Sequence, residues 1–242
     1  MSEDLTPEAL ARQVPGREVR AYPALMSTNA DARAWARAGG PAGGVVVADY
    51  QAAAQGRGGL PWEVRRGRDL AFTLLLRPRL EPDDEGWLFI AGAVALLDVL
   101  GGDASVEWPD RIEHEGRHVA DVAGFAGLGA GGGVEWALVD VLLRDVPAPR
   151  GALLARVAEA VEAVQEPEAA ALARFGERCT TLGRAVEAHI IPTWPDGVRI
   201  PGTASAVLAD GSLVLAQDDG RRIAVRPQHL ARLVPAQSSA AG

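Results

Sequence analysis

Hydrophobic positions in the first third of the chain switch between helical and strand spacing. The segment "STNADARAWARAGG" (residues 27–40) begins with a polar capping group, carries Ala, Trp and Arg at helical intervals and ends in two glycines, which predicts a capped helix. The apolar runs "GGVVVADYQ" (43–51) and "LAFTLLLRP" (70–78) predict two buried strands. Between them, residues 52–69 contain four glycines and several arginines without a period, which predicts a loop. Catalytic and ligand-binding residues often lie on such loops.

The middle of the chain predicts one long helix, a hairpin and two further helices. Apolar residues recur at helical spacing over 84–100 and stop at two glycines, as in a core-facing helix. The runs "ASVEWPD" and "RHVADVAGFAG" predict two strands joined by a turn at Glu115 and Gly116, and "VEWALVDVLLRDV" predicts another strand. Two amphipathic helices separated at Pro167 follow. We therefore expect an α+β domain, a mixed sheet with packed helices.

Beyond Thr181 the pattern becomes that of a small all-β module. Short β-like segments, "GRAVEAHII", "VRIPGTASAVLAD", "SLVLAQDD" and "RRIAVRP", are separated by the turn signals "PDG", "DGS" and "DDGR". We predict an SH3-like β-barrel over residues 182–234. It follows an N-terminal segment (1–17) and a main domain (18–181), and it precedes a frayed tail (235–242).

Composition and charge narrow the functional classes. The chain has 242 residues, 48% of them hydrophobic, and a net charge of −8, so we expect no general attraction to nucleic acid or to an anionic membrane. The apolar run "LFIAGAVALLDVL" is too short to span a bilayer, and the acidic N-terminus lacks an apolar core of signal length. The one cysteine, Cys179, excludes an intramolecular disulfide and fits a reducing compartment. These features predict a soluble cytoplasmic protein.

A collinear series of short motifs resembles the biotin-protein ligase family. "STNADA" is similar to the family's Ser-Thr-Asn segment, and "ADYQ" with the loop through Trp62 is similar to its Gln plus Gly-Arg-Gly-Arg loop. "EWPDRI" falls where the family has Lys-Trp-Pro-Asn-Asp, and "GRHVADVAG" falls where it has a Gly-Arg-Lys-Leu-Ala-Gly-like run. "CTTLGRAV" and "GTASAVLADGSLVL" resemble the junction and core of the family's C-terminal domain. The resemblance covers roughly residues 18–234 and implies the class II synthetase-like fold of biotin and lipoate ligases.

The resemblance also implies a reaction and a site. A ligase of this family makes an acyl-adenylate from biotin and ATP, with magnesium on the phosphate oxygens, and passes the acyl group to a lysine of a carrier domain. The residues expected to bind ligand are Ser27, Thr28, Asn29, Gln51, Gln55, Gly56, Arg57, Trp62, Trp108, His118 and Ala120. Of these, Arg57 and His118 are the expected catalytic groups. The charged turn around His114 is interpreted as solvated, so no metal site built by the protein is predicted.

The sequence departs from the family pattern where the family carries positive charge. Without a gap, the family's first Gly-Arg pair aligns with Ala54 and Gln55, and Glu107 stands in place of a lysine. His118 replaces the lysine expected to hold the acyl carboxylate, and Asp121 replaces a glycine where the backbone should approach the ligand. The other departures are Asp110 for asparagine, Arg111 for aspartate, and a last strand that runs directly to Pro147 and Pro149. Carboxylates in such a site would repel phosphates.

Two functional hypotheses follow. In the first, the protein is a divergent or pseudo-ligase paralogue that binds a small acyl ligand or interacts with a carrier domain or a carboxylase subunit. In the second, it is an active ATP-dependent biotin ligase in which Arg57, Arg65 or Arg68 and His118 supply the missing charge. Charge reversal with retention of the scaffold favours the first hypothesis. The sequence leaves the ligand and the oligomeric state open, a homodimer included.

Overall fold

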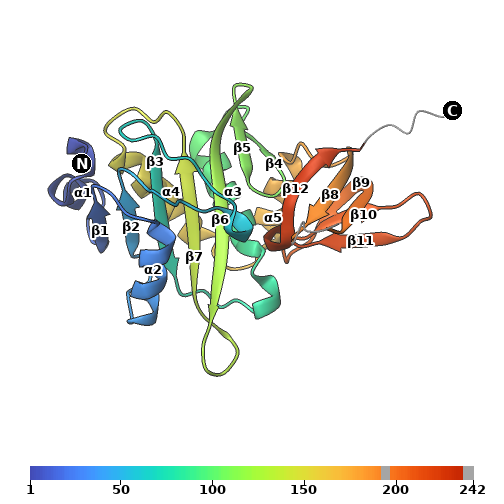
Figure 1. Ribbon diagram of the computed structural model, residues 1–242, viewed down its shortest axis with the longest axis horizontal. Coiled ribbons are helices and arrows are strands. Elements are labelled where there is room, and N and C mark those ends of the chain that lie inside the picture. The colour runs from blue at the N-terminus through green and yellow to red at the C-terminus, as the bar shows by residue number, and fades with distance from the viewer. Residues whose placement is uncertain (192–196, 237–242) are drawn as a thin grey trace.

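The computed structural model describes residues 1–191 and 197–236, in which a seven-stranded sheet forms the main domain (Figure 1). Its strands, in spatial order, are β1 (Val19–Tyr22), β2 (Val45–Ala48), β3 (Leu70–Leu76), β7 (Val134–Leu143), β6 (Arg117–Leu128), β5 (Arg111–His114) and β4 (Ser105–Glu107). β1 and β2 pair in parallel, and the other neighbours in this sheet pair antiparallel. The predicted α+β class with a mixed sheet is confirmed.

Helices cover both faces of this sheet. They are α1 (Pro7–Gln13), α2 (Thr28–Arg37), α3 (Trp87–Leu100), α4 (Gly151–Ala163) and α5 (Ala169–Glu177). Strand alternation separates the two faces. In β2, Val45 and Val47 join the large core that contains α3 and α4, whereas Val46 packs with Trp35 of α2. The sheet therefore has α3 and α4 on one side and α2 alone on the other.

Helix α3 is the centre of the large core. Every residue from Trp87 to Leu97 is buried, so this stretch has no polar face. A Cβ added at Gly124 of β6 would lie 2.5 Å from Cβ of Leu88, so glycine is needed there for the helix to approach the sheet. The predicted helix began at residue 84, but a short 3₁₀ turn, Pro82–Asp84, precedes α3.

The start of α2 forms as its sequence predicts. Ser27 is the N-cap, and its hydroxyl accepts a hydrogen bond from the backbone N–H of Ala30 at 3.4 Å. Trp35 and the small residue Ala32 are buried against the sheet. This packing places the first turn of α2 over β3 and β7, where the candidate site lies.

The first 22 residues contain two elements that the sequence did not predict, α1 in the N-terminal segment and β1 just after it. Thr6 caps α1 by accepting a hydrogen bond from the backbone of Ala9 at 3.2 Å. Leu10 is fully buried, and the carboxylate of Asp4 pairs with Arg150 at 2.8 Å. Both elements are short, so their periodicity is weak, and contacts distant in sequence hold them in place.

The hairpin region has one more turn than predicted. The run "ASVEWPD" was expected to be one strand, but β4 ends at Glu107 and a turn over residues 108–110 leads into β5. The Trp108–Pro109 peptide bond in this turn is cis. The predicted turn at Glu115 and Gly116 is present, with both residues at positive φ.

The C-terminal module is a five-stranded antiparallel sheet, as expected for a small all-β unit. Its spatial order is β11 (Arg222–Val225), β10 (Leu213–Ala216), β9 (Arg199–Val207), β8 (Ala185–Ile190) and β12 (Leu230–Pro235). β12 was not predicted, and it ends one residue beyond the predicted end of the module. Most of the predicted "PDG" turn and most of the predicted tail lie outside the described residues.

The main domain and the C-terminal module meet at the turn over residues 108–110. The indole N–H of Trp108 donates to the carbonyl of Gly211 at 3.0 Å, and its backbone N–H donates to the Thr181 hydroxyl at 2.9 Å. Gly86, just before α3, lies against the backbone of Asp210 and Gly211. Across the described ranges, 1–191 and 197–236, no helix is long and apolar enough to cross a membrane.

Candidate ligand-binding site

A cavity of ≈ 420 Å³ opens where the first turn of α2, the glycine loop and the sheet come together. Its lining residues are Asn29, Arg33, Gln55, Gly56, Arg57, Gly58, Gly59, Glu85, Ala123, Gly124, Phe125, Asp140 and Gln228. Four of the predicted ligand-binding residues are among them: Asn29, Gln55, Gly56 and Arg57. Gln228 comes from the C-terminal module, so both parts of the chain form the wall.

A chain of buried hydrogen bonds runs beside the cavity and reaches its lining at Asn29 and Asp140. The side-chain carbonyl of Gln51 accepts from the backbone N–H of Thr28 at 2.8 Å and from its hydroxyl at 3.2 Å. The Thr73 hydroxyl lies 2.9 Å from that of Thr28 and 2.5 Å from Oδ1 of Asp140. The amide of Asn29 donates to Oδ2 of Asp140 at 2.6 Å. Thr28, Asn29 and Gln51, predicted separately, therefore belong to one network.

Asp140 is the buried acid of this network. Burial raises the pKa of Asp140 to about 6, against the opposing effect of hydrogen bonds from Thr73 and Asn29. The Arg33 charge also favours the ionised form. Asp140 can thus change its protonation state in the mildly acidic range, where an ordinary aspartate stays ionised.

Arg57, the expected catalytic cation of the loop, is engaged within the protein. Its Nε lies 2.7 Å from a carboxylate oxygen of Asp110, with both side chains mostly buried. Its terminal nitrogen donates to the carbonyls of Leu230 and Ala231 at the start of β12. The guanidinium therefore ties the glycine loop to the turn over residues 108–110 and to the C-terminal module.

The acidic departures from the family pattern are charge-balanced. Burial raises the pKa of Asp110 to about 6, and its partner Arg57 acts in the opposite direction. Glu107 is half-buried, and its carboxylate lies 3.6 Å from Nε of Arg111. The prediction treated these carboxylates as unpaired charges in a phosphate site, but each has a cationic partner.

His118, the second expected catalytic residue, lies outside the ≈ 420 Å³ cavity. Its Nε2 is 2.9 Å from Oδ1 of Asp121, and Arg144 donates to Oδ2 of the same carboxylate at 2.5 Å. Burial tends to raise the pKa of Asp121, but these two partners hold it below its usual value. His118 lines a different cavity, of ≈ 290 Å³, together with Val119, Leu143, Arg144 and other residues.

The remaining predicted site residues pack within the protein or cap a helix and do not line the cavity. Trp62 stacks on the Gly56 backbone, where any larger residue would collide with the indole. Trp108 is almost fully buried at the module contact, and Ser27 caps α2. Ala120 is fully buried in the large core beneath the sheet, because its position in β6 faces α3.

Apart from Arg57, sequence reasoning missed the charged residues of the cavity, which are Arg33, Glu85 and Asp140. Asp140 is an ionisable residue in the middle of a strand, with apolar residues on both sides of it, and Thr73 is the one polar residue of its strand. Either exception was a signal that the sequence offered. Arg33 was part of the predicted helix, but its direction depends on the pairing of α2 with the sheet. Glu85 reaches the cavity from the segment before α3, where its carboxylate accepts from the Ala126 N–H at 3.0 Å.

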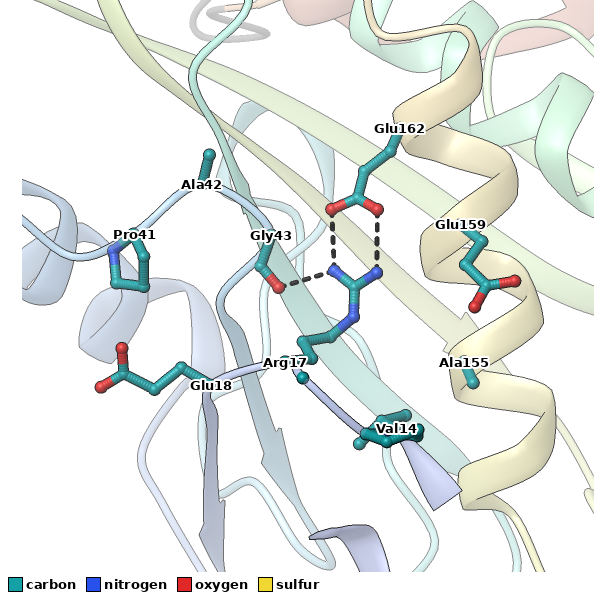
Figure 2. Close-up of a pocket in the computed structure, with 11 residues that line it drawn as sticks. Val14, Arg17, Glu18, Pro41, Ala42, Gly43, Ala155, Glu159 and Glu162 are labelled. Carbon is teal, nitrogen blue, oxygen red and sulfur yellow. Dashed lines mark hydrogen bonds and ion pairs between the residues drawn. The ribbon is translucent and has the colours of Figure 1, made fainter. Parts of the chain in front are cut away.

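A further cavity, of ≈ 360 Å³, lies between the N-terminal segment and α4 (Figure 2). Arg17 spans it, donating to both carboxylate oxygens of Glu162 at 2.8 Å and to the carbonyl of Gly43 at 2.6 Å. These bonds brace α4 against the loop before β2. Within residues 1–191 and 197–236, no group of three or more His, Cys, Asp or Glu side chains is placed to hold a metal ion.

The architecture described above is that of the biotin protein ligases. A biotin protein ligase from Aquifex aeolicus, in complex with biotin and ATP, superposes with a TM-score of 0.64 at 16% identity over 90% of this chain and 99% of that one. A biotin protein ligase-like protein of unknown function from Silicibacter sp. gives 0.64 at 17% identity, over 88% of this chain and 96% of that one.

Sequence comparison points the same way over part of the chain. The bifunctional ligase/repressor BirA of Bacillus subtilis is 28% identical over 126 residues, which are 50% of this chain and 39% of BirA. The match thus spans well under half of that relative. No protein-family model matches the chain. The resemblance predicted from short motifs is confirmed, and the divergence predicted with it is evident in these identities.

Proposed function

We propose that this protein is a divergent member of the biotin-protein ligase family that binds a small acyl ligand in the ≈ 420 Å³ cavity but does not make an adenylate in the family's manner. The observation that carries the proposal is the engagement of Arg57 by Asp110 and by two backbone carbonyls of the C-terminal module. The Arg57 charge is already paired with a carboxylate and its Nη1 is bonded to backbone carbonyls, so Nη2 is the nitrogen left to bind a phosphate oxygen.

The acyl-ligand half of the proposal rests on the buried network that reaches the cavity at Asn29 and Asp140. Thr28, Asn29 and Gln51 keep their side chains in one network with Asp140. A network whose members are mutually satisfied is rigid, and rigid polar groups are what orient a small ligand. The solved relatives include ligases in complex with biotin and with ATP, which makes a carboxylic acid a reasonable ligand class for this chain.

The site is poorly suited to bind a nucleoside triphosphate. Transfer to an α-phosphate needs fixed cations where charge develops. Arg57 is paired with Asp110, and both His118 and Arg144 are paired with Asp121. The cavity also contains Asp140 and Glu85 as acids. The cations expected to bind ATP are therefore already neutralised by carboxylates of the protein.

Three assays on the purified full-length chain test the proposal. Calorimetric titration with biotin, with ATP and magnesium, and with both together measures whether the ligands cooperate. Pyrophosphate exchange into ATP detects adenylate formation, and incubation with a biotin carrier domain detects transfer to lysine. We expect acyl-ligand binding without exchange or transfer. Biotin-dependent exchange followed by carrier labelling would overturn the proposal.

The same assays test the alternative function, that of an active biotin ligase. The observation in its favour is the preserved network of Thr28, Asn29 and Gln51 beside a glycine loop that still carries Arg57. In that case the Arg57 contacts must open during the reaction, and Arg57→Ala would abolish exchange. A carrier domain or carboxylase subunit as partner, a homodimer and a cytoplasmic location stay predictions from the sequence.

A further inference from the structure

Arg33 is a cation of the cavity that the family resemblance did not indicate. It follows Asn29 by one helical turn on α2, so both side chains project from the same side of the helix. Its guanidinium carbon lies 3.7 Å from the ring centroid of Phe125, another lining residue. Stacking on an aromatic face holds the planar guanidinium in one orientation. Arg33 is therefore presented to the cavity in a defined pose.

Arg33 is half-buried and forms no ion pair among the described residues, whereas Arg57, Arg144 and Arg150 each pair with a carboxylate. Its Nε is buried and has no hydrogen-bond partner among the described residues. The charged groups near it are Asp140, Arg37 and Glu85. Burial, the largest influence, lowers the pKa of Arg33, and Asp140 and Glu85 oppose this effect only in part.

Both neighbouring acids are already held by other donors. Asp140 accepts from Asn29 and Thr73, and Glu85 accepts from the backbone of Ala126. Neither forms an ion pair with Arg33 within 4.0 Å. A half-buried guanidinium with free donors gains more from an incoming anion than a fully exposed one does, because less water competes for it.

We propose that Arg33 is the anion anchor of the cavity and binds the carboxylate of a small organic acid, whose other end carries N–H or O–H donors that face Asp140. This inference rests on the proposed acyl-ligand function. Arg33 thereby supplies, from α2, the positive charge that His118 does not bring to this cavity. The apolar side chains of the lining are Ala123 and Phe125, so a purely alkyl acid would bury little surface.

The test compares acids with their neutral carboxamides by calorimetry. Biotin, whose head is a cyclic urea with N–H donors, and hexanoate, whose tail is an alkyl chain, are each titrated beside biotinamide and hexanamide. For the wild type we expect the acid to bind about tenfold more tightly than its amide, as for a hydrogen bond to a charged group. We also expect biotin to bind more tightly than hexanoate.

The variants separate an anchor from a structural residue. Arg33→Ala should abolish the preference for acid over amide while leaving amide affinity unchanged. Arg33→Gln, which keeps most of the stem over Phe125, should do the same if the alanine variant folds poorly. Arg37→Ala is the matched control, because Arg37 is an exposed arginine one turn further along the same helix, and it should keep the full preference.

Each failure has its own signature. If acid and amide lose affinity equally in both Arg33 variants, Arg33 is structural and the anchor is overturned. An acid preference that survives Arg33→Ala overturns the anchor and leaves the proposed acyl-ligand function standing. Absence of binding by all four compounds to the wild type overturns both, because biotin and hexanoate together cover the acid class proposed.

Discussion

The Nε of Arg57 lies 2.7 Å from a carboxylate oxygen of Asp110, which joins the glycine loop to the turn after β4. The same guanidinium donates to Leu230 and Ala231 in the C-terminal module. Three segments far apart in sequence therefore meet at one side chain. Arg57 is therefore part of the contact between the main domain and the C-terminal module.

This contact predicts that Arg57→Ala lowers the free energy of unfolding. Removing one partner of a largely buried pair leaves Asp110 without compensation, which typically costs about 3 kcal/mol. Urea denaturation followed by fluorescence measures the change. Arg111→Ala is the control, since Arg111 pairs at the exposed surface with Glu107 and Glu113, where such pairs contribute about 0.5 kcal/mol. Equal stability of the two variants would contradict the structural role.

A pH-dependent stability is expected from Asp140. Its pKa is about 6 in the folded protein, against an unperturbed 3.8. The folded state therefore holds this proton more tightly than the unfolded chain. Protonated Asp140 stabilises the fold at low pH by roughly 3 kcal/mol, and this contribution is lost as the pH rises through about 6.

Asp140→Asn isolates that contribution. The stability of the variant minus that of the wild type should rise from about pH 4 to about pH 6.5 and then level off. The pKa values of Asp69 and Asp121 are lowered in the fold, so the stability that these two carboxylates contribute is lost as the pH falls below about 4. They are common to both proteins, so they cancel in the difference. A flat difference curve would show that Asp140 titrates normally.

The order of elements could be predicted from sequence, because it depends on local patterns. The cap at Ser27, the buried strands β2 and β3 and the helix α3 each follow from a run of a few residues. Elements held by distant contacts were missed. α1 depends on Arg150 reaching Asp4, and the start of β12 is held by Arg57.

The charge of the site could be predicted only in part, for the same reason. Asp121 was predicted to place a carboxylate where the family has a glycine beside the ligand, but it is not among the residues that line the ≈ 420 Å³ cavity. Its partner Arg144 lies 23 residues away, directly after the neighbouring strand β7, so the pairing cannot be predicted without the β6–β7 register. Arg33 shows the converse: its place on a helix was predictable, but its contact with Phe125 was not.

Trp108→Phe should weaken the contact between the main domain and the C-terminal module. The phenyl ring fills most of the indole volume but cannot donate to the Gly211 carbonyl, so the loss should be about 2 kcal/mol. Trp136→Phe is the matched control, because Trp136 is also buried, and the indole hydrogen bonds among the described residues are those of Trp87 and Trp108. Urea midpoints compare the two variants. A larger loss in Trp136→Phe would contradict the assigned role of the hydrogen bond.

Gly43 and Gly39 offer a comparison of backbone strain with steric conflict. Both have positive φ, 78° and 85°, so alanine strains the backbone by about 1 kcal/mol at either position. A Cβ at Gly39 meets nothing within 4 Å, whereas a Cβ at Gly43 would lie 2.7 Å from a carboxylate oxygen of Glu162 and 3.0 Å from Arg17 (Figure 2). Gly43→Ala must therefore also disturb the ion pair that braces α4. We expect it to cost about 2 kcal/mol more than Gly39→Ala in urea denaturation.

In a Glu162→Ala background this excess should shrink, because the colliding group is gone. An excess that persists there would place the conflict elsewhere in the loop before β2.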